Sequence, residues 1–210
     1  MSLNDTLVPL RSSGIEAQRN RRLGIIMLVA LTAFSVTGCG GKHSGHNTAL
    51  IETDLGTIKV ELLEDEAPKT VENFRTLAER DYYNGTIFHR VISNFMIQGG
   101  DPKGNGTGGE TASGAPLPNE INRSSPLYQG GSYQRGLVAM ANAGSPESGR
   151  SQFFIMHQTY PLKPNYTIFG RVIEGIDVVD KIATAPTTMG ADGAKSRPLT
   201  PVKVQKITIQ

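Results

Sequence analysis

Arg90 lies between Phe88 and Ile92 in a short segment whose residue types favour a β-strand. An arginine is always charged and carries five N–H donors in one plane. A fixed donor of this kind lowers a reaction barrier when it binds the transition state more strongly than the ground state. The plainer interpretation, an ordinary surface arginine, stays open on these residues alone.

Two pairs of residues are expected to share strand faces near such a donor. Side chains two positions apart in a strand point the same way, so Met96 lies beside Gln98, and Gln152 beside Phe154. The apolar members could line a pocket for a ring, and the glutamines could hydrogen-bond a peptide backbone. Without other information, a phenylalanine or methionine in a strand is most often part of the core.

The body of the chain, residues 49–210, is predicted to be mainly β. Polar and apolar residues alternate over 57–62, which indicates a half-buried strand. A helix is expected at 68–80, because acidic residues at 64–66 lead into Pro68 and apolar residues follow at helical spacing. The other predicted elements are strands at 49–53, 88–92, 95–98, 137–141, 152–157, 167–172 and 201–210, a glycine-rich loop at 99–114 and a second helix at 175–183. Many short strands with two helices favour a closed antiparallel barrel.

Three segments of the body, in this order along the chain, resemble the signatures of the cyclophilins. They are Phe88–Ile92 continuing through Phe95–Asp101, then Gly136–Gly144, and then Ser151–Ile155 followed by Ile168–Val172. The resemblance covers about residues 48–210. It implies peptidyl-prolyl cis-trans isomerase activity and a closed, eight-stranded antiparallel β-barrel capped by two α-helices.

The resemblance also implies roles for individual residues. Arg90 would be the catalytic arginine, and Gln98 would hold Arg90 and the substrate backbone. The substrate-binding residues that it implies are Phe95, Met96, Phe154 and Leu162 in a proline pocket, with Ala141, Asn142, Gln152 and Tyr166 around the peptide. Tyr166 stands where many members have a histidine, and Tyr160-Pro161 where many have a tryptophan. The pocket rim is therefore altered, and we expect weakened binding of cyclosporin.

The chemistry of Arg90 agrees with isomerisation. Twisting an amide costs about 18–20 kcal/mol because resonance is lost, and Xaa-Pro bonds isomerise slowly unaided. The twisted prolyl nitrogen becomes pyramidal and gains a lone pair, to which an arginine can donate without any nucleophile, metal or proton transfer. One alternative is a proline-peptide binding or chaperone module with little turnover, and another is a purely structural envelope lipoprotein. The presence of Arg90 favours the enzyme.

The N-terminal region has the layout of an export signal. An apolar run at 23–33 directly follows three arginines and is too short for an ordinary membrane-spanning helix. Small residues then precede Cys39, the only cysteine, in a Val-Thr-Gly-Cys sequence that resembles the bacterial lipobox. The resemblance implies a lipoprotein signal peptide at 1–38, a lipid on Cys39 and a flexible tether at 39–48. We therefore expect a protein of the bacterial cell envelope, lipid-anchored on the extracytoplasmic face of a membrane, that assists folding of exported proteins.

Charge and composition limit the other partners. The formal net charge is +2 and its excess of arginines lies in the first 38 residues, so the neutral body gives no case for nucleic acid. No metal is expected, because His43 and His46 stand in the tether without carboxylate or cysteine partners. No cofactor is expected either, since the glycine-rich run at 104–109 lacks the Gly-Lys-Ser/Thr ending of a phosphate loop. A monomer is the default.

Overall fold

The computed structural model describes residues 47–145 and 147–210. The predicted signal peptide, Cys39 and all but the last two residues of the predicted tether lie outside the described residues, so these predictions stay predictions. No helix in the described part is long and apolar enough to cross a membrane.

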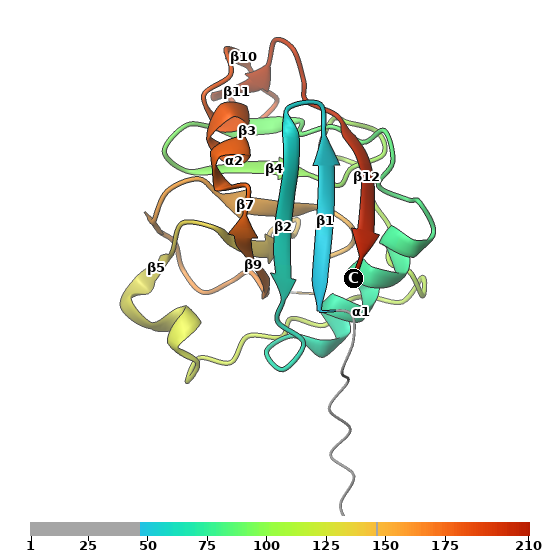
Figure 1. Cartoon of the computed structure of the whole chain (residues 1–210). Coiled ribbons are helices and arrows are strands. Elements are labelled where there is room, and N and C mark those ends of the chain that lie inside the picture. Colours follow the sequence, from blue (N-terminus) through green and yellow to red (C-terminus); the bar gives the residue numbers. More distant parts are fainter. Residues whose placement is uncertain (1–46, 146) are drawn as a thin grey trace, which may run out of the picture. The chain divides into compact units, whose positions relative to one another are not determined.

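Eight strands form one antiparallel sheet in the order β12-β1-β2-β9-β6-β7-β4-β3. Their bounds are β1 Thr48–Thr53, β2 Gly56–Leu62, β3 Arg90–Ile92, β4 Met96–Gly99, β6 Leu137–Met140, β7 Phe153–Met156, β9 Ile168–Glu174 and β12 Val204–Ile209. In Figure 1, β1, β2 and β12 run vertically while β3 and β4 run horizontally, so the sheet is curled. The predicted mainly β architecture with eight antiparallel strands is therefore confirmed.

The two ends of this sheet, β3 and β12, come close through the residues that precede them. Ile87 and Lys203 form an isolated antiparallel bridge, and the N–H of Phe88 donates to the carbonyl of Val202 at 3.0 Å. Within residues 47–145 and 147–210 no ladder of paired residues joins β3 to β12. Closure into a complete barrel therefore stays a prediction.

Most predicted strands are present with shifted ends. β1 begins at Thr48, one residue earlier than expected, and β9 continues to Glu174. The segment before Arg90 is not in the ladder, although strand was expected from Phe88; the N–H of Phe88 donates instead to the carbonyl of Val202. Two short pairs were not predicted: β5 (Ser132–Tyr133) with β8 (Tyr160–Pro161), and β10 (Thr187–Met189) with β11 (Lys195–Pro198). A 3₁₀ helix at Pro126–Gly131 was also not predicted.

Both predicted helices are present, as α1 (Pro68–Glu79) and α2 (Ile176–Ala183). The acidic residues at 64–66 precede α1, as expected, and none of them lies in its first turn. Instead, the carboxylate of Glu120 accepts the N–H groups of Lys69 and Thr70 at 3.0 and 2.8 Å. These two groups have no partner within the helix, and a negative charge at a helix N-terminus is favourable.

The alternation of side chains divides the apolar residues between two clusters. In β4, Ile97 belongs to the larger core, which also contains Phe74 of α1 and Val179 of α2. Its neighbour Met96 belongs to a second, smaller cluster that includes Phe154 of β7. The second cluster lies under the candidate site and supplies its apolar floor.

Candidate active site

A cavity of about 260 Å³ brings together nine of the predicted site residues. It is lined by Arg90, Phe95, Met96, Gln98, Ala141, Asn142, Phe154, Leu162 and Tyr166. Gln152, the remaining predicted residue of the body, lines an adjoining cavity of about 290 Å³ that shares three residues with the first. The ladder explains this convergence, because Gln98 of β4 pairs with Phe154 of β7, which pairs with Ala139 of β6.

Arg90 stands at the first position of β3, at the polar edge of the cavity. Its Nη1 donates to Gln98 Oε1 at 3.4 Å and lies 3.7 Å from the sulfur of Met96. Its guanidinium carbon is 6.0 Å from the centre of the Phe95 ring, within the range of a cation–π contact. Its shortest bond, 2.8 Å from Nε to Asp192 Oδ2, was not predicted.

Asp192 belongs to the turn between β10 and β11. Partial burial acts to raise its pKa, but hydrogen bonds from Ser196 and Arg90 outweigh this and lower the pKa of Asp192 to about 2. The carboxylate is therefore ionised at physiological pH and forms an ion pair with Arg90. No sequence pattern connects Asp192 to Arg90, since the two residues are 102 positions apart.

The apolar part of the cavity is made of side chains that are fixed by their neighbours. Met96 and Phe154 are buried, and the Phe154 ring meets the Tyr166 ring edge-on at 5.3 Å. Tyr166 is held through its backbone, because the buried Tyr133 hydroxyl donates to its carbonyl at 2.8 Å and accepts from its N–H at 3.2 Å. Burial raises the pKa of Tyr133, so its hydroxyl stays protonated as a donor. No pattern in the sequence predicts this contact.

Tyr160 occupies the rim of the cavity in the altered segment. Its ring lies 4.4 Å from the ring of Phe95, and 41% of the residue is exposed. An altered rim was predicted, but this tilted ring contact was not. Tyr160 therefore extends the aromatic wall that Phe95 begins.

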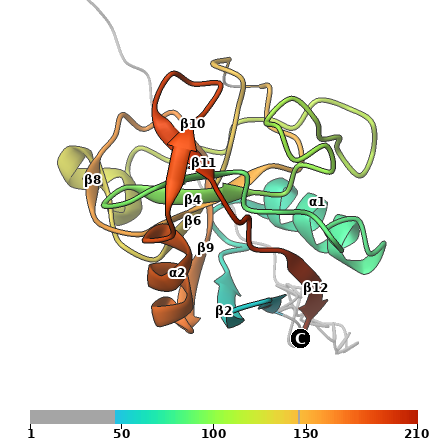
Figure 2. The same ribbon diagram turned by 90° about the horizontal axis from the view of Figure 1, so that it is seen from above.

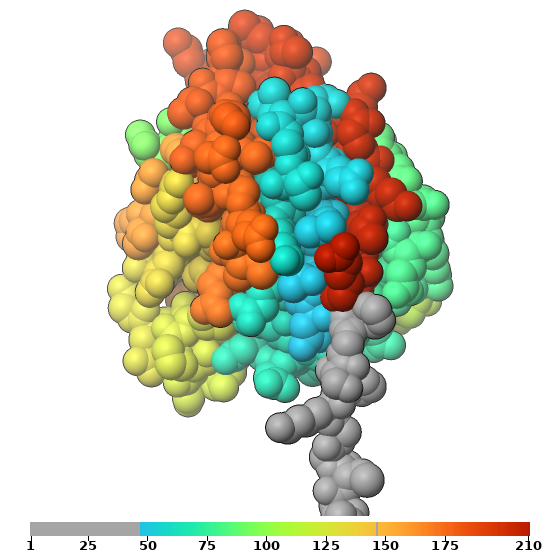
Figure 3. Space-filling view, in the orientation of Figure 1, coloured from blue at the N-terminus to red at the C-terminus, as the bar shows by residue number. Residues whose placement is uncertain are grey.

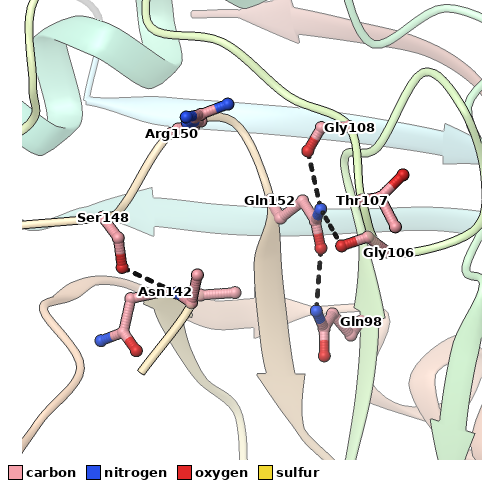
Figure 4. Close-up of a pocket in the computed structure, with 10 residues that line it drawn as sticks. Gln98, Gly106, Thr107, Gly108, Asn142, Ser148, Arg150 and Gln152 are labelled. Atoms are coloured by element: carbon pink, nitrogen blue, oxygen red, sulfur yellow. Dashed lines mark hydrogen bonds between the residues drawn. The ribbon is translucent and has the colours of Figure 1, made fainter. Parts of the chain in front are cut away.

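The adjoining cavity is a polar groove beside the glycine-rich loop (Figure 4). The Nε2 of Gln152 donates to the carbonyls of Gly106 and Gly108 at 3.0 and 2.8 Å, and its Oε1 accepts from Gln98 at 3.0 Å. Asn142 donates to the carbonyl of Asn165 at 2.9 Å across the loop that follows β6. The glutamines thus join the loop, the groove and Arg90 in one hydrogen-bonded chain.

The fully buried carboxylate of Asp101 fixes the glycine-rich loop. It accepts backbone N–H groups from Lys103, Asn105 and Gly106 at 2.8, 3.1 and 2.6 Å. Burial acts to raise the pKa of Asp101, but these N–H groups outweigh it and lower the pKa. Gly100, before it, has φ of 80°, and a Cβ there would lie 2.5 Å from the carbonyl of Ser151. Only glycine fits at this position, which lies in the glycine-rich loop predicted over 99–114.

Comparison with known proteins identifies the family to which this arrangement belongs. Residues 48–209 match the family model described as cyclophilin type peptidyl-prolyl cis-trans isomerase/CLD. The chain belongs to the cyclophilin-type peptidyl-prolyl cis-trans isomerases. The members of this family carry isomerase activity, so the predicted enzyme class is confirmed.

Individual cyclophilins resemble the chain over nearly their whole length. A peptidyl-prolyl cis-trans isomerase of Arabidopsis thaliana is 45% identical over 160 residues, which cover 76% of this chain and 93% of the relative. The human peptidyl-prolyl cis-trans isomerase-like 1 is 43% identical over 157 residues, which cover 74% of this chain and 88% of the relative. A solved cyclophilin of Cryptosporidium parvum, crystallised in the presence of the dipeptide Ala-Pro, aligns with a TM-score of 0.69 at 34% identity. The alignment covers 78% of this chain and 98% of the solved chain. These relatives are eukaryotic proteins, and the predicted bacterial origin stays a prediction.

Proposed function

We propose that the cavity binds the proline ring of a polypeptide and that Arg90 catalyses rotation about the preceding Xaa-Pro bond. The observation that carries this proposal is the meeting of a buried apolar floor, Met96 and Phe154, with a charged donor at its edge. A proline ring fits an apolar floor, while the bond to be rotated must then lie at the polar edge. Proline-containing polypeptides are therefore the proposed substrates.

The proposed mechanism needs only binding and electrostatics. Ring contacts in the cavity hold the proline, and Gln98 and Asn142 offer hydrogen-bonding groups to the substrate backbone on either side of the proline. As the peptide bond twists, the prolyl nitrogen gains a lone pair, and an Arg90 N–H donates to it. This bond exists in the twisted state and is absent in the planar ground state, which is the condition for catalysis. No covalent bond is made or broken, so no nucleophile takes part.

The alternative weighed from the sequence, a binding or chaperone module with little turnover, would use the same cavity. The position of Arg90 favours the enzyme, because mere capture of a proline ring does not need a donor at the rotating bond. A protease-coupled assay with the full chain and a panel of Xaa-Pro peptides separates the two. Acceleration of cis-to-trans conversion supports the enzyme. Saturable peptide binding with no acceleration contradicts it and supports the binding module.

We also propose that the protein is held on the extracytoplasmic face of a bacterial membrane through a lipid on Cys39, with residues 1–38 removed as a signal peptide. The support is the order of arginines, apolar run and small residues before the only cysteine. Two or more acyl chains bind a bilayer stably, whereas one gives marginal binding. The clients would then be exported proteins. In a bacterial host, mass spectrometry of the membrane-bound protein tests the proposal: acylated Cys39 at the N-terminus supports it, and an unmodified Cys39 refutes it.

A further inference from the structure

The carboxylate of Asp192 bonds a different nitrogen of the Arg90 guanidinium from the one that donates to Gln98. Nε of Arg90 donates to Asp192 Oδ2 at 2.8 Å, while Nη1 donates to Gln98. Nη2 makes no hydrogen bond to any residue that the structure describes. The ion pair therefore orients the guanidinium without occupying all the donors at the cavity.

Asp192 is itself held in place. Its Oδ1 accepts the hydroxyl of Ser196 at 2.6 Å and the N–H of Ala194 at 3.2 Å. Ser196 is buried in β11, which pairs with β10 and lies beside β3 (Figures 1 and 2). Because both carboxylate oxygens are engaged, Asp192 is a fixed acceptor and not a mobile surface charge.

The ion pair has little to contribute to folding. The Arg90 and Asp192 side chains are 31% and 27% exposed, and ion pairs in contact with solvent add little stability. Figure 3 shows the orange-red atoms of the β10–β11 region at the surface, at the top of the view. The main effect of the pair is therefore expected on the orientation of Arg90.

We propose that Asp192 is a positioning residue, which orients the Arg90 guanidinium for the isomerisation before the peptide binds. This role depends on the proposed catalytic role of Arg90. A free arginine side chain samples many rotamers, and ordering it in advance removes that cost from the catalytic step. The paired carboxylate also weakens the positive field at the cavity. Its orienting effect on Arg90 should therefore raise the rate of isomerisation while its charge should lower it, and experiment must separate the two effects.

Two substitutions in the full-length chain separate these effects. Asp192→Ala removes the acceptor, and kcat is expected to fall about tenfold, less than the hundredfold to thousandfold loss that follows removal of a donor itself. KM for an Xaa-Pro peptide is expected to stay within about twofold, because orientation of the donor acts on the transition state and not on ground-state binding. Asp192→Asn keeps an oxygen that accepts the Nε–H and is expected to retain most of the turnover. Asp177→Ala is the matched control, since it removes another exposed ion pair, with Lys181 at 2.9 Å, and should change neither constant.

A double-mutant cycle with Arg90→Ala distinguishes the two proposals. If Arg90→Ala keeps its turnover, the proposed catalytic role of Arg90 fails. If Arg90→Ala loses turnover but Asp192→Ala does not, only the positioning role is overturned. It is also overturned if Asp192→Ala lowers kcat further in the Arg90→Ala background, because a residue acting through Arg90 has no effect without it. An Asp192→Asn variant as impaired as Asp192→Ala overturns orientation by the accepted hydrogen bond.

Discussion

The ring of His157 accepts a hydrogen bond from the backbone of Asn94: the Asn94 N–H lies 2.9 Å from Nδ1. Asn94 has φ of 62° in the turn between β3 and β4, a conformation that asparagine adopts more readily than most residues. Since Nδ1 accepts, the ring proton of neutral His157 is on Nε2, which lies 3.2 Å from Asp180 Oδ1. His157 thus supports the turn that connects Arg90 in β3 to Met96 in β4.

The first prediction follows from the titration of His157. Burial lowers the pKa of His157, and so does nearby Arg135, while Asp180 opposes them. The unfolded chain, with a histidine pKa of about 6.5, therefore binds the proton more tightly, and the unfolding free energy falls as pH drops below about 6.5. The contribution of neutral His157 to the free energy of unfolding is fully present above that pH. Denaturant unfolding between pH 7.5 and 5.5 measures the slope.

His157→Asn gives the control for this slope, because the asparagine oxygen can accept the Asn94 N–H without titrating. The variant is expected to show a shallower pH dependence. Burial also lowers the pKa of His89, so its contribution has the same sign and accounts for part of the remaining slope. A slope in the His157→Asn variant equal to that of the parent would contradict the assignment.

The second prediction concerns the apolar floor. Phe154 and its neighbour Phe153 are both buried, but Phe154 lines the cavity and Phe153 packs in the larger core against Phe74 and Tyr83. Phe154→Leu should raise KM for proline peptides by about fivefold or more, because even one missing methylene in a hydrophobic pocket is worth about 1–3 kcal/mol. Phe153→Leu should lower the melting temperature with KM unchanged. If both variants change KM equally, the floor does not bind the proline ring.

The third prediction concerns the rim. A tryptophan offers a larger apolar face and an indole N–H donor, whereas Tyr160 stacked on Phe95 offers a smaller ring. We expect weak cyclosporin binding by the protein, and tighter binding after Tyr160→Trp or Pro161→Trp. Calorimetric titration measures the dissociation constants. Unchanged affinity in both variants would show that the rim does not limit binding.

The sequence predicted the parts of the site that follow from local patterns. Alternation along a strand placed Met96 with Gln98, and the pairing of β4 with β7 brought Phe154 beside them as expected from the family resemblance. The sequence did not predict the contacts of Asp192 or Glu120. Neither residue belongs to a helical or strand pattern of apolar residues, and each partner is about 50 or more positions away. Such contacts arise only when hairpins and loops pack on the sheet. The short β10–β11 pair was missed for the same reason, since its three paired positions carry no apolar alternation.

The last prediction tests the division of labour between Arg90 and the apolar floor. Arg90→Ala should lower kcat about a hundredfold to a thousandfold, since one preorganised donor contributes about 2.7–4 kcal/mol to a barrier. The effect on peptide affinity should be smaller, because the ring contacts of the floor remain.

Two further substitutions make the test of Arg90 specific. Arg90→Lys should restore little, since a compact ammonium cannot replace a planar group that bonds Asp192 through Nε and Gln98 through Nη1 together. Arg171→Ala removes an exposed arginine that pairs with Glu61 away from the cavity, and it should leave turnover unchanged. Turnover and peptide affinity are measured for each variant after its melting temperature confirms folding. If Arg90→Ala keeps turnover within about threefold of the parent, which is less than ~0.7 kcal/mol of barrier, Arg90 is not the catalytic donor and other groups of the cavity carry the catalysis.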